Sequence, residues 1–152
     1  MNAEPIQILL VEDSPSDVEL TIEAMREAKV ANQLHVVRDG VDAMAFLRQE
    51  GDYETKPRPD LVLLDLNLPR KNGKEVLAEM RADKNLQAIP VAVLTTSKAE
   101  SDILRSYQLG ANCFITKPVH LNEFLEVIHG IEEFWLTIVC LPPRVIRSTA
   151  TF

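Results

Sequence analysis

Short, mostly apolar runs alternate along the chain with segments in which apolar residues recur every three or four positions. The runs are four to six residues long and end at polar or charged residues. Runs of this kind are typical of strands that are buried on both faces of a parallel sheet. The pattern predicts strands at residues 6–11, 34–37, 61–65, 91–94 and 113–116.

The segments between the runs predict helices. Ser14 and Pro15 open the first helix, because serine caps helix N-termini and proline suits the first helical position. Gly110 is expected to stop the fourth helix, and the fifth is expected to run from about residue 121 to about residue 139. Apolar residues at helical spacing mark the first four: Val18, Ile22, Met25 and Ala28; Val41, Met44 and Leu47; Val76, Leu77 and Met80; and Ile103, Leu104 and Tyr107.

Strand and helix alternate five times, which predicts an α/β domain with a parallel sheet and helices on both faces. In such sheets the groups needed for chemistry collect at the carboxyl ends of the strands. Polar residues follow or end four of the predicted strands: Glu12 and Asp13, Asp65, Thr95 and Thr96, and Lys117. We therefore expect these residues, which are far apart in sequence, to meet at one edge of the sheet.

Composition narrows the function classes. The 152-residue chain has a formal net charge of −7, and 46% of its residues are hydrophobic, as in a globular protein with one core. An acidic chain without a basic stripe argues against binding to nucleic acid or to an anionic membrane surface. Cys113 and Cys140 lack the spacing of a metal site, and they are expected to be reduced thiols in a cytosolic protein. No segment resembles a signal peptide or approaches the ~20 apolar residues of a membrane span.

The predicted cluster of acids suggests phosphoryl chemistry. Three carboxylates in one site repel each other unless a hard cation binds them, and oxygen ligands suit Mg²⁺. A lysine and a hydroxyl nearby could hold phosphoryl oxygens, and a carboxylate can itself be the nucleophile that forms an acyl phosphate. Paired acids alone are usually a solvated loop or a helix cap, and a lone Lys-Pro is usually structural. The signal lies in the order and placement of all the parts.

Together these residues resemble the receiver domain of two-component response regulators. The matching pieces are Glu12–Asp13, Asp65-x-Asn67-x-Pro69 with Gly73 beyond, Thr95, and Phe114-Ile115-Thr116-Lys117-Pro118. The resemblance covers residues from about 6 to about 130. It implies a flavodoxin-like (βα)5 fold with strand order 2-1-3-4-5. In this interpretation residues 1–141 form one receiver domain, residues 142–152 form a short and partly disordered tail, and no output domain follows.

The resemblance also implies a phosphoacceptor and a metal site. Asp65 accepts a phosphoryl group from the phosphohistidine of a sensor histidine kinase. Asp13 and Asp65 bind Mg²⁺ through their carboxylates, Asn67 binds it through its backbone carbonyl, and Glu12 acts through a metal-bound water. Glu12 stands where aspartate is commoner in the family, and its longer side chain should still reach such a water. A protein of this kind is a signalling phosphoacceptor with slow self-catalysed phosphorylation and dephosphorylation, not an enzyme.

A second group of residues is implied to bind the phosphoryl group and to switch with it. Lys117 pairs with the phosphoryl group, and its peptide bond to Pro118 is expected to be cis. Thr95 moves its hydroxyl onto a phosphoryl oxygen, and Phe114 rotates inward behind it. Phe114 replaces the tyrosine often found there, which puts any role of a tyrosine hydroxyl in doubt. Thr96 is bulkier than the alanine of many members and is expected to slow the access of water to the acyl phosphate.

The last predicted helix carries two apolar stripes at 100° per residue. The first is expected to pack on the sheet: Leu121, Phe124, Leu125, Ile128, Trp135 and Val139. The second is expected to be exposed, and a lone receiver helix needs only one buried face: Val127, Ile131, Phe134, Ile138 and Leu141. We expect this second stripe to be a homodimer interface, although a tail folded back over it is the alternative.

Two segments indicate which group of receiver proteins the chain resembles most. Residues 134–142 and the polar loop at residues 51–59 are similar to the single-domain regulators that are paired with cyanobacterial phytochromes. That similarity implies a phytochrome-type, light-sensing histidine kinase as the partner, and homodimers.

Two other functions remain open at this stage. An aspartyl-phosphate phosphatase of the haloacid-dehalogenase type also uses a strand-end aspartate and Mg²⁺. It needs an acid two residues further on, where this chain has Asn67, which cannot donate a proton as an acid does. A flavin-binding domain of similar fold needs a phosphate-cradling loop after the first strand, where Glu12 and Asp13 would repel a phosphate.

Overall fold

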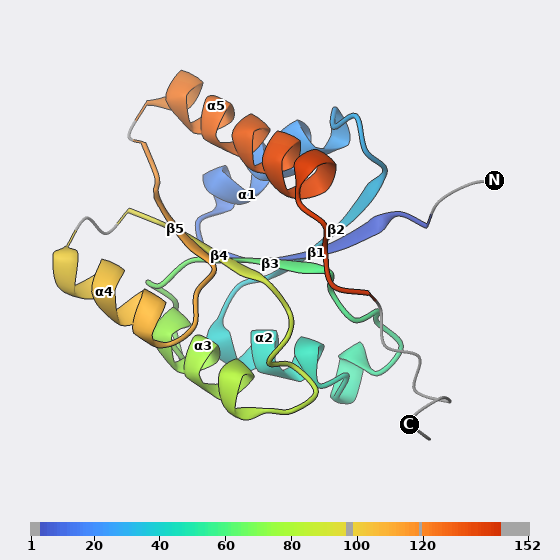
Figure 1. Cartoon of the computed structure of the whole chain (residues 1–152), viewed down its shortest axis with the longest axis vertical. Helices are drawn as coiled ribbons and strands as arrows, with labels where there is room; N and C mark the ends of the chain where they lie inside the picture. The colour runs from blue at the N-terminus through green and yellow to red at the C-terminus, as the bar shows by residue number, and fades with distance from the viewer. Residues whose placement is uncertain (1–3, 97–98, 119, 144–152) are drawn as a thin grey trace.

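The computed structural model describes residues 4–96, 99–118 and 120–143, and these form a parallel sheet with helices on both faces (Figure 1). The strand order β2-β1-β3-β4-β5 is the one that the resemblance implied. The strands are β1 (Ile6–Val11), β2 (Asn32–Val37), β3 (Leu61–Leu64), β4 (Val91–Thr95) and β5 (Cys113–Thr116). The helices are α1 (Pro15–Arg26), α2 (Gly40–Leu47), α3 (Gly73–Ala82), α4 (Glu100–Gln108) and α5 (Leu121–Ile131), with a short 3₁₀ turn η1 (Gly51–Tyr53) in the predicted loop and a π-helix η2 (Glu132–Ile138) after α5.

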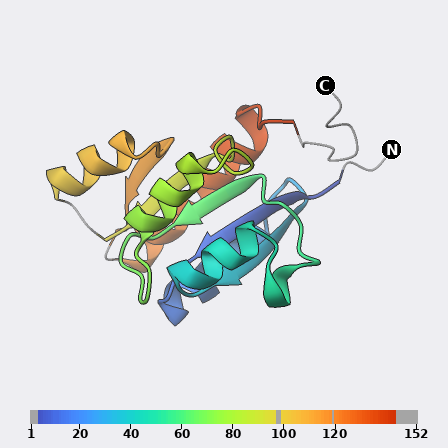
Figure 2. The ribbon, with the colours of Figure 1, turned by 90° about the horizontal axis from the view of Figure 1, so that it is seen from below.

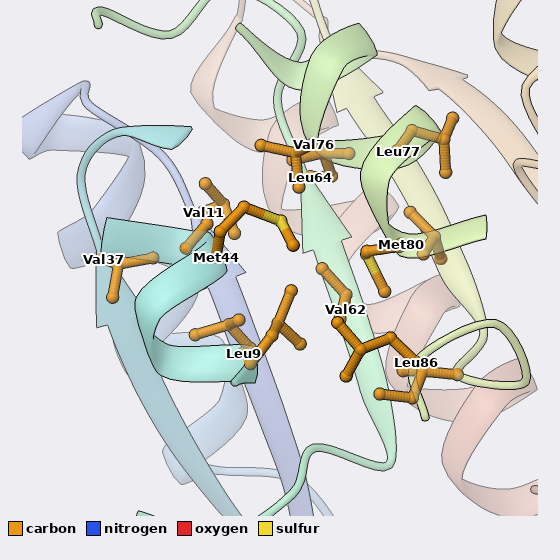
Figure 3. Packing of buried hydrophobic residues seen from close by; sticks show 14 of the residues in the cluster. Leu9, Val11, Val37, Met44, Val62, Leu64, Val76, Leu77, Met80 and Leu86 are labelled. Atoms are coloured by element: carbon orange, nitrogen blue, oxygen red, sulfur yellow. The ribbon is translucent and has the colours of Figure 1, made fainter. Parts of the chain in front are cut away.

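The sheet separates two hydrophobic cores. Helices α1 and α5 cover one face, and α2, α3 and α4 lie on the other, as Figures 1 and 2 show from two directions. Successive residues of a strand point to opposite faces, so Leu9 and Val11 enter the core under α2 and α3 (Figure 3), whereas Ile8 and Leu10 enter the core under α1 and α5. Burial on both faces explains why the central strands are continuous apolar runs.

Side-chain caps fix where the helices begin. The Ser14 hydroxyl accepts a hydrogen bond from the backbone N–H of Asp17 at 3.4 Å, as the sequence predicted. The Asp39 carboxylate caps α2 in the same way, with 2.7 Å to the N–H of Asp42. Asn72 and Glu75 form a reciprocal capping box at the start of α3. These caps satisfy N–H groups that the helices leave unpaired and hold three helix starts beside the carboxyl edge of the sheet.

Gly73 lets α3 begin directly against the end of β3. A Cβ atom at this position would lie 2.3 Å from the backbone oxygen of Asp65. No real Cβ tolerates that approach, so only glycine allows this packing. The position of α3 is therefore tied to the residue that follows β3.

The end of the chain differs from the prediction. The uniform helix expected to about residue 139 is α5 followed by the π-helix η2. A π-helix closes its hydrogen bonds over five residues instead of four, so positions spaced at 100° no longer share a face. The prediction also fails within α5 itself, ahead of the π-helix. Ile131, expected on the exposed stripe, lies in the core and is 3% exposed, whereas Leu121, expected to be buried, is 54% exposed.

The predicted interface stripe is therefore mostly wrong as an exposed surface. Val127 and Leu141 are half-buried and pack against the core under α1 and α5, and Ile131 belongs to that core. Phe134 alone among the four stripe residues with described side chains is exposed, at 51%. The side chain of Ile138 lies outside the described residues.

The stripe predicted on α4 also fails. Leu104 and Tyr107 are 60% and 49% exposed, and the buried side chain of this helix is Ser106. The Tyr107 hydroxyl accepts a hydrogen bond at 3.2 Å from the backbone N–H of Phe114, so this helix is held to β5 partly by a polar contact. The stop at Gly110 is confirmed, with a left-handed φ of 99°.

Two further expectations concern the tail and membrane spans. Residues 144–152 of the expected tail lie outside the described residues. Among the helices that are described, none is both long enough and apolar enough to cross a membrane.

Candidate functional site

Strand register brings the predicted acids together. Val11 pairs with Val37 on one side and with Leu64 on the other, so β1, β2 and β3 end at the same level. The chain stays in register one residue further, because the N–H of Asp65 donates to the carbonyl of Val11 at 3.0 Å. Glu12 and Asp65 therefore leave adjacent strands side by side, as the topology predicted.

Strands β4 and β5 supply the hydroxyl and basic groups. The backbone N–H of Lys117 donates to the carbonyl of Thr95 at 2.7 Å, which places both residues at the same edge. Lys117, Thr95, Glu12 and Asp65 are all buried, with exposed fractions of 5%, 0%, 2% and 7%. Asp13 is exposed at the mouth of the site. The predicted constellation is thus confirmed as a spatial cluster.

The Lys117 ammonium is bound by three carboxylates. Its Nζ lies 2.5 Å from Glu12 Oε1, 2.8 Å from Asp17 Oδ2 and 3.2 Å from Asp65 Oδ2. A lysine has three N–H donors, so each carboxylate can take one. Asp17 was not among the site residues expected from the sequence. Its placement four residues after Asp13, on the helix that leaves this strand end, was the available signal.

Burial and hydrogen bonding shift the pKa values of Glu12 and Asp65 in opposite directions. Burial, together with a hydrogen bond to Asp65, raises the pKa of Glu12 from 4.5 to about 8, although Lys117 opposes the rise. Burial also acts to raise the pKa of Asp65, but the hydrogen bond from Glu12 and the charge of Lys117 outweigh it and hold that pKa below its usual value. Without a metal, Glu12 is thus the protonated partner at neutral pH and Asp65 is the carboxylate.

Lys117 stays charged in spite of its burial. Removal from water acts to lower its pKa, but hydrogen bonds to Asp17 and Glu12 and the charge of Asp65 raise it well above its ordinary value. The site therefore presents an ionised, buried aspartate next to a permanent cation. Such a carboxylate can act as a nucleophile toward an electrophilic phosphorus, with the cation beside the incoming oxygens.

The acids also fit a hard divalent cation. One carboxylate oxygen each from Glu12, Asp13 and Asp65 lie within 4.8 Å of one another. Oxygen ligands of this kind suit Mg²⁺, which usually takes one or two carboxylates and keeps several waters. The role of the Asn67 carbonyl as a further ligand stays a prediction. Its backbone N–H donates to Asp65 Oδ1 at 3.1 Å, which fixes the acceptor side chain.

The predicted switch residues are near the site, but their movement stays a prediction. The Thr95 hydroxyl accepts a hydrogen bond from the Asn67 side chain at 3.4 Å, which ties β4 to the loop after β3. Thr96 is exposed at the end of β4. Phe114 is half-buried and packs against the core under α2 and α3. Of these residues Thr95 is the one with a contact that leads to the Asp65 loop, and the roles of Thr96 and Phe114 stay predictions.

The expected cis bond before Pro118 is wrong. The structure has no cis peptide bond among its described residues, which include Lys117 and Pro118. The trans form of an X–Pro bond is favoured by about 0.5–1 kcal/mol.

Comparison with known proteins gives one consistent family. The profile of the response regulator receiver domain matches residues 8–129. The chain is 51% identical to Response regulator Rcp1 of Synechocystis sp. over 138 residues. This alignment covers 91% of this chain and 94% of that protein. The Mn²⁺-bound form of Rcp1 superposes with a TM-score of 0.89 at 50% identity, over 91% of this chain and 100% of that one. The phosphorylated cyanobacterial phytochrome response regulator RcpA gives a TM-score of 0.89 at 51% identity, over 92% and 100% of the two chains.

Proposed function

We propose, since the chain belongs to the family of response regulator receiver domains, that Asp65 accepts a phosphoryl group from a sensor histidine kinase. Membership of this family makes the chain a two-component signalling protein. One observation carries the assignment of the acceptor: Asp65 is buried, its pKa is held low, and the Lys117 ammonium is 3.2 Å from its Oδ2. The haloacid-dehalogenase alternative has no such support, because Asn67 cannot act as the general acid.

Each neighbour has a role in this proposal. Glu12, Asp13 and Asp65 hold Mg²⁺, which supplies positive charge that neutralises the transferred group. The Mn²⁺-bound Rcp1 structure supports a divalent cation at such a site. Lys117 balances the charge of the phosphoryl oxygens, and the Thr95 hydroxyl donates a hydrogen bond to one of them. Residues of this chain thus bind and orient the group that Asp65 receives.

Phosphorylation by a small donor tests this function directly. Incubation with acetyl phosphate and Mg²⁺ is expected to add the mass of one phosphoryl group to the intact protein. An acyl phosphate is cleaved by hydroxylamine, and the resulting mass change should map to the peptide that contains Asp65. Omitting Mg²⁺ is the control and should prevent the addition. A wild-type protein that gains no phosphoryl group with Mg²⁺ present would overturn the proposal.

We further propose that the phosphoryl donor is a phytochrome-type kinase. The likeness to Rcp1 and to the phytochrome response regulator RcpA supports this choice. A panel of purified sensor kinases, each first labelled on histidine, should show fastest transfer to this chain from a cyanobacterial phytochrome. Transfer at equal rates from unrelated kinases would contradict the assignment of the donor while leaving Asp65 as the acceptor.

Self-association through the end of the chain is also proposed, now centred on Phe134. Its ring is half exposed and makes an edge contact with Trp135, with 5.8 Å between ring centres. Exposed aromatic side chains are typical anchors of protein interfaces. Sedimentation should show a dimer that Phe134→Lys converts to monomer, whereas Leu104→Lys on α4 serves as an equally exposed control. A wild-type monomer at high concentration would refute this interface.

The proposed signalling role also implies where and how the protein acts. We place it in the cytoplasm, a reducing compartment that suits the free thiols of Cys113 and Cys140. We propose that it passes on its state by contact with other proteins, because its acidic balance gives no electrostatic attraction to nucleic acid.

A further inference from the structure

Asp17 is the one member of the Lys117 cluster that comes from a helix. Glu12 and Asp65 follow strands, but Asp17 lies in the first turn of α1. Its Oδ2 is 2.8 Å from Lys117 Nζ, closer than the 3.2 Å between that nitrogen and Asp65. With Glu12, Asp17 and Asp65 each accepting from one of its three donors, the ammonium has no N–H left for an incoming group.

The backbone of α1 holds Asp17 in this position. The backbone N–H of Asp17 donates to the capping hydroxyl of Ser14, and the carbonyl of Asp17 accepts a hydrogen bond from the Thr21 hydroxyl at 2.8 Å. Thr21 is 1% exposed, so this part of the helix is fixed against the protein interior. The contact between Asp17 and Lys117 is therefore a built feature of the turn and not a chance meeting of two surface side chains.

The three contacts differ in what their loss costs. The Glu12 side chain is 3% exposed and that of Asp17 is 24% exposed. A buried polar group that loses its partner meets no water in its place, whereas Asp17 can be hydrated when Lys117 leaves. Asp17 is thus the carboxylate that gives up the ammonium most easily.

We propose that Asp17 is a positioning residue that competes with the phosphoryl group for Lys117. In the resting protein it draws the ammonium toward α1. A phosphoryl group on Asp65 offers three charged oxygens and takes the donor that Asp17 releases. This inference rests on the proposed function of Asp65. It makes α1 an element whose contacts change with phosphorylation.

Asp17→Asn tests the competition, because it removes the charge and keeps the size of the side chain. The concentration of acetyl phosphate that gives half-maximal phosphorylation should fall about two- to fivefold, the range expected for a partly exposed ion pair. Glu19→Gln is the matched control, since Glu19 is an exposed acid on the same helix. It should leave that concentration unchanged, and Asp17→Glu should restore most of the wild-type value.

Thermal stability separates competition from a purely structural role. Beryllium fluoride with Mg²⁺ serves as a stable mimic of the phosphoryl group. Asp17→Asn should lower the unfolding temperature of the resting protein more than that of the protein saturated with this mimic. Equal lowering of both temperatures would show that Asp17 only stabilises the fold and would overturn the proposal.

The remaining outcomes are equally decisive. If Asp17→Asn and Glu19→Gln behave alike, or if Asp17→Asn needs more acetyl phosphate, Asp17 does not compete for Lys117, while phosphorylation of the wild type still supports the function of Asp65. If the wild type takes up neither a phosphoryl group nor beryllium fluoride, the proposed function and this inference fall together.

Discussion

Asp65→Asn is expected to abolish phosphorylation by acetyl phosphate. The amide is a poor nucleophile and cannot form an acyl phosphate, and among the described residues only Glu12 shares both the burial of Asp65 and its contact with Lys117. Glu12 has the burial but is protonated at neutral pH because its pKa is about 8. Intact mass measured after incubation with acetyl phosphate and Mg²⁺ should therefore show no added phosphoryl group.

The control for this variant is Asp52→Asn. Asp52 is an exposed acid in η1, in the loop between α2 and β3, so the charge change is the same and the site is untouched. It should be phosphorylated like the wild type. A folded Asp65→Asn protein that still gains one phosphoryl group would show that another residue is the acceptor.

Raising the pH is expected to destabilise the metal-free protein. Glu12 has a pKa of about 8 in the folded state and an ordinary value of 4.5. Between these pH values the folded state holds a proton on Glu12 that the unfolded state has lost. The contribution of Glu12 to stability is complete below about pH 4.5 and is lost as the pH rises through about 8. Each pKa unit corresponds to about 1.4 kcal/mol, so the loss should reach a few kcal/mol. Asp65 acts in the opposite direction, because its lowered pKa contributes stability that is lost only in acid, below its ordinary 3.8.

Urea unfolding in the presence of a chelator, at a series of pH values from 5 to 9, measures this effect. Glu12→Gln should flatten the curve, because it removes the group that titrates. Saturating Mg²⁺ should flatten it too, because a cation favours the ionised acids and takes the place of the proton. Stability that rises steadily from pH 5 to pH 8 without metal would contradict the assigned protonation of Glu12.

The sheet and its site were predictable because they depend on short-range patterns. The run Leu61–Leu64 is apolar at every position, and Gln7 is the one polar residue in the run Ile6–Val11. A parallel sheet is the arrangement that buries both faces of such strands. Once the strands are parallel, Glu12, Asp65 and Lys117 must meet at one edge. The shared edge therefore followed from the alternation of strands and helices, whereas the order of the strands within the sheet came from the resemblance to receiver domains.

The errors arose where a local departure from regular geometry decides the outcome. The stripe with Ile131 was drawn through one uniform helix, but Ile131 lies within α5 and packs in the same core as Phe124 and Ile128. The π-helix changes the period only for the residues after Ile131. The exposure of Leu104 and Tyr107 depends on how far α4 lies from the sheet, which its own sequence does not encode. Asp17 was missed because an acid in the first turn of a helix already has an ordinary explanation.

The contact at Gly73 limits how the domain can respond to a change at Asp65. Backbone meets backbone there, with no side chain between α3 and the end of β3 to absorb a displacement. A displacement of the Asp65 backbone therefore acts directly on the backbone of α3. On the opposite side the link to α1 runs through the side chain of Lys117 to the partly exposed carboxylate of Asp17. A change at Asp65 can thus reach α1, and α5 packed against it, through side-chain contacts alone, whereas it reaches α3 only through the backbone.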